Sequence, residues 1–322
     1  MSLKRKRDME DILKSRIIKF IIGSEKAEFT VHSMSIATLS EKFRSIVSFS
    51  QPGENEKIVT WSNVETSTFV NLVEYAYNKD YTIPQLARTG DISQATAQDM
   101  VAGPEIAKKK KIKSEHASSP AKVDIVKRKT NTNEVEAAIS LHTWMLEISQ
   151  GDESPQKSSA QYRFCQQHFS LNTPASDGAV TESSFATEAW LMDIQQHRLT
   201  DYETVFRTHT NLYILANKYN ITDLKDLCYR KIRLTLLYAP TADQLFAALF
   251  HTIRIVYDNT IHNDPLRSLL AKYCISDMAS IMSCKGDDRI APLLKSVPSF
   301  AADLLLEIPH DYWVQIRDGG QA

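Results

Sequence analysis

The sequence predicts an α+β fold, in which a small sheet flanked by helices is followed by an additional helical region. Near the N-terminal end, short apolar runs of strand character alternate with runs of helical period. The later dense block, residues 203–306, shows helical period almost throughout. Hydrophobic residues make up 43% of the 322 residues and charged residues 24%, so most of the chain can bury a core.

The first expected elements are two strands that form a hairpin. Residues 17–22 are an almost continuous β-rich apolar run, which is typical of a buried strand. Gly23-Ser24 supplies a turn, and residues 28–31 then alternate between polar and apolar, as in a strand with one buried face. The run Lys57–Trp61 predicts a third strand.

Two stretches of this first block have helical period. Apolar residues recur with helical spacing from Ser33 to Phe49, and Pro52-Gly53 ends that run. A second helix is expected from about residue 66, with Thr66 or Ser67 capping its first turn and Pro84 blocking its continuation. Its apolar face holds Phe69, Leu72, Val73, Ala76 and Tyr77.

The later dense block predicts a series of helices with recognisable ends. Asn220 stops the first of them, and Thr222 is expected to cap the next. Residues 241–244 read Thr-Ala-Asp-Gln and match a capping box. Asp264-Pro265 places a good N-cap before a proline at the first helical position. The last helix is expected at residues 300–306.

Composition divides the chain into four parts. Residues 1–13 are predicted to be a disordered basic N-terminus, and residues 14–83 with 203–236 one domain, split by a polar, partly disordered insertion at 84–202. Residues 237–322 form the helical C-terminal region. Apolar islands in the insertion, around Trp144, Phe164 and Trp190, are typical of segments that fold when they dock.

Several motifs, in the right order, resemble the BTB/POZ signature. They are Phe29-Thr30-Val31-His32, Ser40-Glu41-Lys42-Phe43, Tyr75-Ala76-Tyr77 and, after the insertion, the run His209–Tyr219. The long insertion, together with residues 265–270 and 300–305, resembles BTB proteins of filamentous fungi. The resemblance implies a BTB/POZ fold and a non-enzymatic adaptor that binds a protein partner or a second copy of itself.

The candidate contact residues lie on the first strand, on the first helix, and in a segment that resembles one found in cullin-binding BTB domains. Ile18, Phe20 and Met34 are the first set. Cullin-binding BTB domains carry an apolar-x-Glu element, to which Phe49-Ser50-Gln51 is the nearest match; Gln51 accepts hydrogen bonds but lacks the charge. A substrate adaptor of a cullin-type ubiquitin ligase therefore stays an alternative.

A nuclear, transcription-associated regulator is the other alternative. Lysine and arginine clusters favour nuclear import, although solvated charge runs explain them equally well; they are Lys4, Arg5, Lys6, Arg7 and Lys108, Lys109, Lys110, Lys111. BTB domains of the repressor type carry an acidic residue at the position of Ile17 and a basic residue at the position of Ser33. The charged pocket that those repressors use is therefore expected to be absent here. No aromatic or recognition-helix pattern near the lysines favours direct nucleic-acid binding.

Other chemistry finds no support in the sequence. It holds no G-x-S-x-G, G-x-G-x-x-G or Walker A pattern, so no catalytic or cofactor-binding residue is expected. Cys165 and His168 have the spacing of half a metal site, but no second pair follows, and no metal is expected. Four scattered cysteines are typical of an intracellular protein of the nucleus or cytoplasm. No apolar run is long enough to predict a membrane span.

Overall fold

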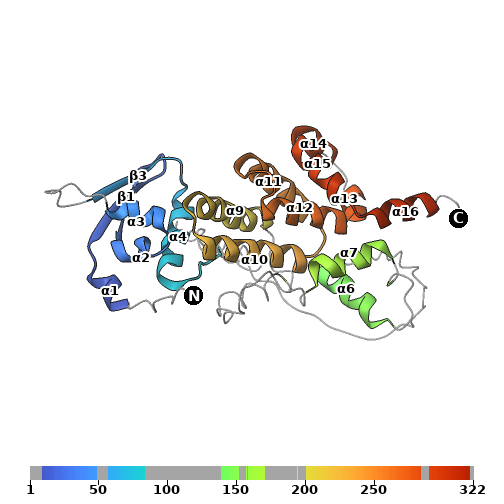
Figure 1. The fold of residues 1–322 in the computed structure, drawn as a ribbon, viewed down its shortest axis with the longest axis horizontal. Helices are drawn as coiled ribbons and strands as arrows, with labels where there is room; N and C mark the ends of the chain where they lie inside the picture. The colour runs from blue at the N-terminus through green and yellow to red at the C-terminus, as the bar shows by residue number, and fades with distance from the viewer. Residues whose placement is uncertain are drawn as a thin grey trace, which may run out of the picture. The chain divides into compact units, whose positions relative to one another are not determined.

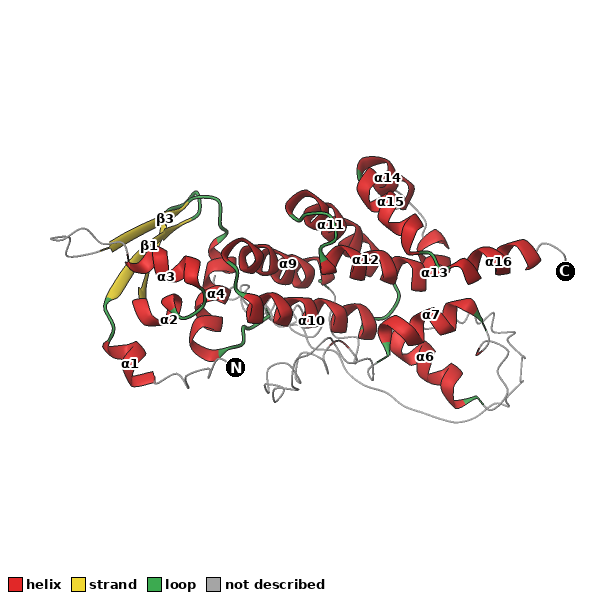
Figure 2. Cartoon of the chain, in the orientation of Figure 1, coloured by secondary structure: helices red, strands yellow, loops and turns green. Residues whose placement is uncertain are grey.

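The computed structural model describes residues 9–48, 57–83, 139–151, 157, 159–170, 194, 201–283 and 290–319. By their contacts, all of these belong to one folded unit built from Met1–Leu86 and Ile139–Ala322. This unit combines many helices with one three-stranded sheet, as Figure 2 shows, so it belongs to the α+β class.

The sheet consists of β1 (Ile17–Ile22), β2 (Ala27–His32) and β3 (Lys57–Trp61), in the order β2-β1-β3. β1 pairs antiparallel with β2 and parallel with β3, so the predicted hairpin and third strand are confirmed. The turn after β1 places Gly23 at φ +73°, in the left-handed region that glycine enters without steric cost.

One face of the sheet packs on helices and carries the core side chains of β1. Ile18, Phe20 and Ile22 are fully buried, while the alternate residues of β1 point to the other face. The ring of Phe20 lies 5.0 Å, centroid to centroid, from Phe69 of α4 (Thr66–Asn78). The N-cap of α4 is Glu65, without a capping side-chain bond, so the predicted cap at Thr66 or Ser67 is wrong.

The region before β3 is divided into short helices. α1 (Met9–Lys14) lies within the segment predicted to be disordered, and its Ile12 is buried, which corrects that prediction for residues 9–13. The predicted helical run from Ser33 separates into α2 (Ser33–Ala37) and α3 (Glu41–Ser48). Ser40 lies at the break, where its Oγ accepts a hydrogen bond from the backbone N of Phe43 at 3.2 Å.

α9 (Tyr202–Tyr219) and α10 (Thr222–Tyr238) lie side by side, and α11 (Asp243–Asn259) packs on α9 (Figure 1). Asn220, at φ +57°, ends α9 as predicted. The other two predicted caps are wrong, because the N-caps are Ile221 and Ala242, both without a capping side-chain bond. Thr241 instead donates from Oγ1 to the Oδ2 of Asp277 at 3.1 Å.

The remaining C-terminal helices are α12 (Pro265–Ser276), α13 (Met278–Ser283), α14 (Ile290–Ser296), α15 (Pro298–Glu307) and α16 (His310–Gly319). Asp264 caps α12 as predicted, since its side chain accepts a bond from the backbone N of Leu266. The predicted last helix falls within α15, but α16 follows it, so that prediction of the final element is wrong.

Two helices of the predicted insertion are part of this folded unit. α6 (Leu141–Gln150) packs on α10, and α7 (Ala160–Phe169) packs on α12 and α16. The ring of Phe169 is buried and meets Tyr273 of α12 edge-on, at 6.1 Å between centroids. The apolar islands around Trp144 and Phe164 therefore pack on the folded unit, whereas their folding on contact stays a prediction, and the island around Trp190 lies outside the described residues.

Candidate interaction surface

Four exposed apolar side chains come from α1, β1 and α2. Met9 is 47% exposed, Leu13 58%, Ile17 53% and Met34 42%. We call these four residues the N-terminal apolar surface. Single exposed apolar residues are ordinary, but a group of them on neighbouring elements is the usual sign of an interaction site.

Local geometry brings the four residues together. Met9 and Leu13 are one turn apart on α1, whose inner side buries Ile12. The segment that follows is fixed to α2 by two hydrogen bonds: the backbone N of Ser33 donates to the carbonyl of Arg16 at 2.8 Å, and the N of Met34 donates to the Oγ of Ser15 at 3.2 Å. The backbone of Leu13 and Ile17, on either side of Ser15, therefore runs close to that of Met34.

α2 is itself tied to the rest of the unit through His32. The Nδ1 of His32 lies 2.8 Å from the hydroxyl of Tyr77, which also accepts a bond from the His32 backbone N at 3.2 Å. The Oγ of Ser35 donates to the carbonyl of His32 at 2.7 Å. His32 and Tyr77 belong to two separate sequence motifs, and these motifs contact each other in the structure.

Two ion pairs lie on α1 and on the strands next to these residues. Lys14 pairs with Glu10 on α1, and Lys19 of β1 pairs with Glu28 of β2 at 2.8 Å between Nζ and Oε2. An apolar centre with a polar rim is the arrangement of protein interfaces. What this surface can do is bury apolar area against a matching surface.

The predicted contact residues fall into three groups in the structure. Met34 is exposed as required. Ile18 and Phe20 are fully buried in the core, which removes them from the contact set. The remaining predicted residues lie outside the described part of the chain: Phe49, Gln51, Lys4, Arg5, Lys6, Arg7, Lys108, Lys109, Lys110 and Lys111.

Sequence reasoning missed Met9 and Leu13 and gave Ile17 no contact role. The available signal was the spacing of Met9 and Leu13, four residues apart on either side of Ile12. That spacing indicates a short helix with apolar residues on more than one side. The segment was predicted to be disordered because only its charge was considered.

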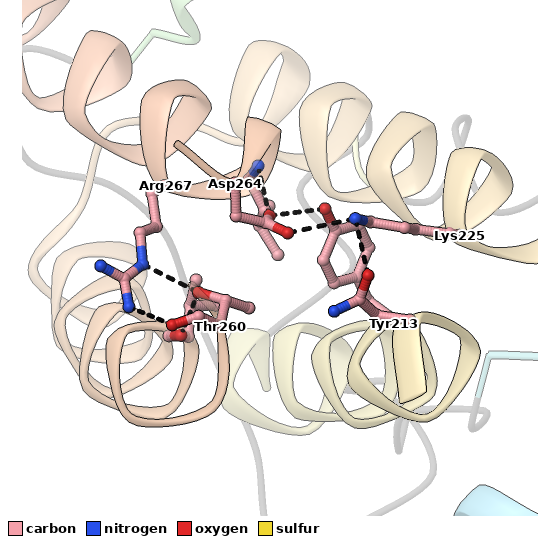
Figure 3. Close-up of polar contacts among 8 residues, drawn as sticks. Tyr213, Lys225, Thr260, Asp264 and Arg267 are labelled. Carbon is pink, nitrogen blue, oxygen red and sulfur yellow. Dashed lines mark hydrogen bonds and ion pairs between the residues drawn. The ribbon is translucent and has the colours of Figure 1, made fainter. Parts of the chain in front are cut away.

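A buried polar network holds the C-terminal helices against α9 and α10 (Figure 3). Asp264, only 4% exposed, accepts bonds from the Tyr213 hydroxyl at 2.6 Å and from the Nζ of Lys225 at 3.1 Å. The same ammonium donates to the Oδ1 of Asn217 at 2.9 Å. One carboxylate thus connects α9, α10 and the start of α12.

Arg267 extends these polar contacts to the end of α11 (Figure 3). Its Nε donates to the Oγ1 of Thr260, and its Nη2 donates to the carbonyl of Tyr257, both at 2.8 Å. Its guanidinium also lies 4.4 Å from the centre of the Tyr257 ring. These bonds hold the turn between α11 and α12 in one conformation.

A second buried cluster contains the groups that chemistry often uses. The hydroxyl of Tyr81 lies 2.7 Å from the Nδ1 of His209 and 3.4 Å from the Sγ of Cys228. Burial lowers the pKa of His209 well below its usual value and raises that of Cys228 to about 12. Both groups are neutral near pH 7 and have no exposed surface, so we interpret the cluster as part of the core.

Neither a metal-binding cluster nor a membrane-spanning helix occurs among the described residues. No group of three His, Cys, Asp or Glu side chains there could hold a metal ion. Cys165 is buried beside the carbonyl of Ser276, and the ring of His168 packs on Phe164. None of the helices in the described ranges is both long and apolar enough to cross a bilayer. No protein-family model, curated protein or solved structure matches this chain.

Proposed function

We propose that this chain is a non-enzymatic, intracellular protein–protein interaction adaptor, and that its N-terminal apolar surface binds a second copy of the chain. The observation that carries the proposal is the group of four exposed apolar residues, Met9, Leu13, Ile17 and Met34, on three adjoining elements. A two-fold contact places the same surface on both sides of the interface, so an apolar patch meets an apolar patch.

We further propose that the sheet and its helices are a BTB/POZ fold. Its support is the order of the motifs that resemble this family, together with contacts between them. His32 of the first motif bonds Tyr77 of the third, and Phe43 of the second packs on Tyr219 of the last, 4.8 Å between ring centroids. These contacts assign a packing or hydrogen-bonding role to one residue of each of the four motifs.

The energy available from the surface can be bounded. Burying the exposed half of each side chain contributes roughly 1 kcal/mol, and a symmetric contact uses eight side chains, for a gross gain of roughly 8 kcal/mol. Loss of translational and rotational freedom opposes association by at least about 4 kcal/mol. The apolar residues alone therefore support a weak dimer, and contacts of the charged rim must add to it for tight binding.

Sedimentation velocity over a series from low micromolar to several hundred micromolar protein tests this proposal. The wild type is expected to shift from monomer to dimer, and Leu13→Asp to remain monomeric, because a charge would be buried in the interface. Leu306→Asp on α15, where the leucine is 81% exposed, is the matched control and is expected to dimerise like the wild type. A wild type that stays monomeric throughout the series refutes self-association through this surface.

The two alternative functions rest on other residues. A cullin-ligase adaptor depends on Phe49 and Gln51, and a nuclear regulator on the lysine and arginine clusters, all outside the described residues. No described contact favours either one over the proposal above. Nucleus and cytoplasm both remain proposed locations.

A further inference from the structure

The folded unit is assembled from two stretches of chain, one before residue 84 and one after residue 138. Tyr219 of α9 completes an aromatic cluster begun by the first stretch: its ring stacks on Trp61 at 4.9 Å and packs on Phe43. The Nζ of Lys42 also donates to the carbonyl of Lys218 at 2.8 Å. The core of the sheet therefore depends on helices that follow the intervening segment.

A buried ion pair joins the two stretches close to the point where the first one ends. Lys231 of α10 is 1% exposed, and its Nζ lies 2.6 Å from the Oδ1 of Asp80. The same ammonium donates to the carbonyl of Tyr81 at 2.8 Å and lies 4.0 Å from the centre of its ring. A lysine buried this deeply needs its carboxylate partner, because an uncompensated charge in the core is strongly destabilising.

Tyr81 occupies a position between α9 and α10. Its side chain is 1% exposed, and its hydroxyl contacts His209 of α9 and Cys228 of α10. The backbone of its neighbour Thr82 is held as well, since its N donates to the Oε2 of Glu74 at 2.7 Å. Residues 80–82 are thus fixed to both stretches by side-chain and backbone bonds.

The chain is fixed again where the second stretch begins. The N of Thr241 donates to the carbonyl of Ile139 at 3.1 Å, and Ser140 forms an isolated bridge with Pro240. Ser140 also caps α6 by accepting a bond from the N of Thr143. Each flank is therefore fixed by contacts of its own, independently of residues 84–138.

From these contacts we infer that the folded unit does not need a continuous backbone between Ile83 and Ile139. A chain cut there stays together as a non-covalent complex, with the Asp80–Lys231 pair and Tyr81 as its principal link. A single cut within residues 84–138 would then leave both stretches of the folded unit, and the N-terminal apolar surface, in place.

The test uses the full chain with the recognition sequence of a site-specific protease inserted between Val123 and Asp124. Cleavage is run to completion, as judged on a denaturing gel, and the product is then examined by native size-exclusion chromatography. The two pieces are expected to elute together at the volume of the uncut chain, with helical circular dichroism retained. Pieces that separate or aggregate after cleavage overturn the inference.

Matched variants test the role assigned to the ion pair. Asp80→Asn removes the charge partner of a buried lysine across the cut, whereas Glu28→Gln removes the partner of Lys19 within the first piece. On dilution of the cut protein, Asp80→Asn should raise the dissociation constant about a hundredfold, and Glu28→Gln by less than about tenfold. Equal dissociation constants for the two variants would show that the Asp80–Lys231 pair does not hold the two pieces together.

Tyr81→Phe covers the case in which uncut Asp80→Asn does not fold. It keeps the ring between α9 and α10 and removes only the hydroxyl that contacts His209. A raised dissociation constant in the cut protein, at unchanged circular dichroism, supports the assigned link. A constant equal to that of the cut wild type contradicts it.

Discussion

Replacing Asp264 with alanine should destabilise the protein more than any ordinary loss of a helix cap. The buried Tyr213 hydroxyl loses its acceptor, which costs about 1–3 kcal/mol. The N-cap bond to Leu266 is lost as well, at about 1 kcal/mol. Lys225 keeps its bond to Asn217 and is partly exposed, so its share is small. The expected total is about 2–4 kcal/mol.

Urea denaturation followed by circular dichroism measures this loss as a lower midpoint at unchanged slope. Asp201→Ala is the matched control, because Asp201 also caps a helix, accepting from the N of Thr204, but is exposed and outside the network. That control should lose only about 1 kcal/mol. Tyr213→Phe combined with Asp264→Ala should cost less than the two single changes added together.

Equal shifts of the urea midpoint for Asp264→Ala and Asp201→Ala would contradict this prediction. Such a result would mean that Asp264 acts only as a cap and that the bonds to Tyr213 and Lys225 contribute nothing net. Strict additivity of Asp264→Ala with Tyr213→Phe would contradict it in a second way, because it would show that the two residues are not coupled.

Three further predictions concern other buried groups. Burial keeps His209 neutral in the folded protein, whereas the same side chain takes up a proton in the unfolded chain, so the free energy of unfolding should fall as the pH drops below about 6.5. His209→Gln should reduce this dependence of the unfolding free energy on pH, as measured by urea titrations at successive pH values. In Cys284→Ser protein, the three buried cysteines should react with a thiol reagent only after denaturation, and reaction in the native state would contradict their burial. Phe169→Ala should lower stability by about 3–5 kcal/mol, since α7 packs through this ring, and a change below about 1 kcal/mol would show that α7 is not docked.

Short-range patterns were enough to predict most of the elements. The alternation at residues 28–31 and the apolar run at 17–22 gave the hairpin, and helical spacing gave α4, α9 and α11. Asn220 and Asp264 were also assigned correctly as helix ends, because the side chain or backbone conformation needed there is a property of that residue and its nearest neighbours.

Predictions failed where a residue had a partner far away in the sequence. Thr241 has the spacing of a capping box, but its hydroxyl bonds Asp277 instead. Ile18 and Phe20 are as apolar as Ile17 and Ile21, so the sequence of β1 does not tell which face is covered. Contacts such as that between Phe20 and Phe69 decide it, and they place two of the predicted contact residues, Ile18 and Phe20, in the core.

The local elements follow from short-range sequence patterns, because helix and strand periodicity, turns and some caps depend on residues within about four positions of one another. Only the tertiary structure decided that Lys231 and Asp80 form a buried pair across the predicted insertion, and that Asp264 connects three helices. It also placed the exposed side chains of Met9, Leu13, Ile17 and Met34 on neighbouring elements. These relations depend on which distant segments pack together, since burial of a side chain is a property of its neighbours in space.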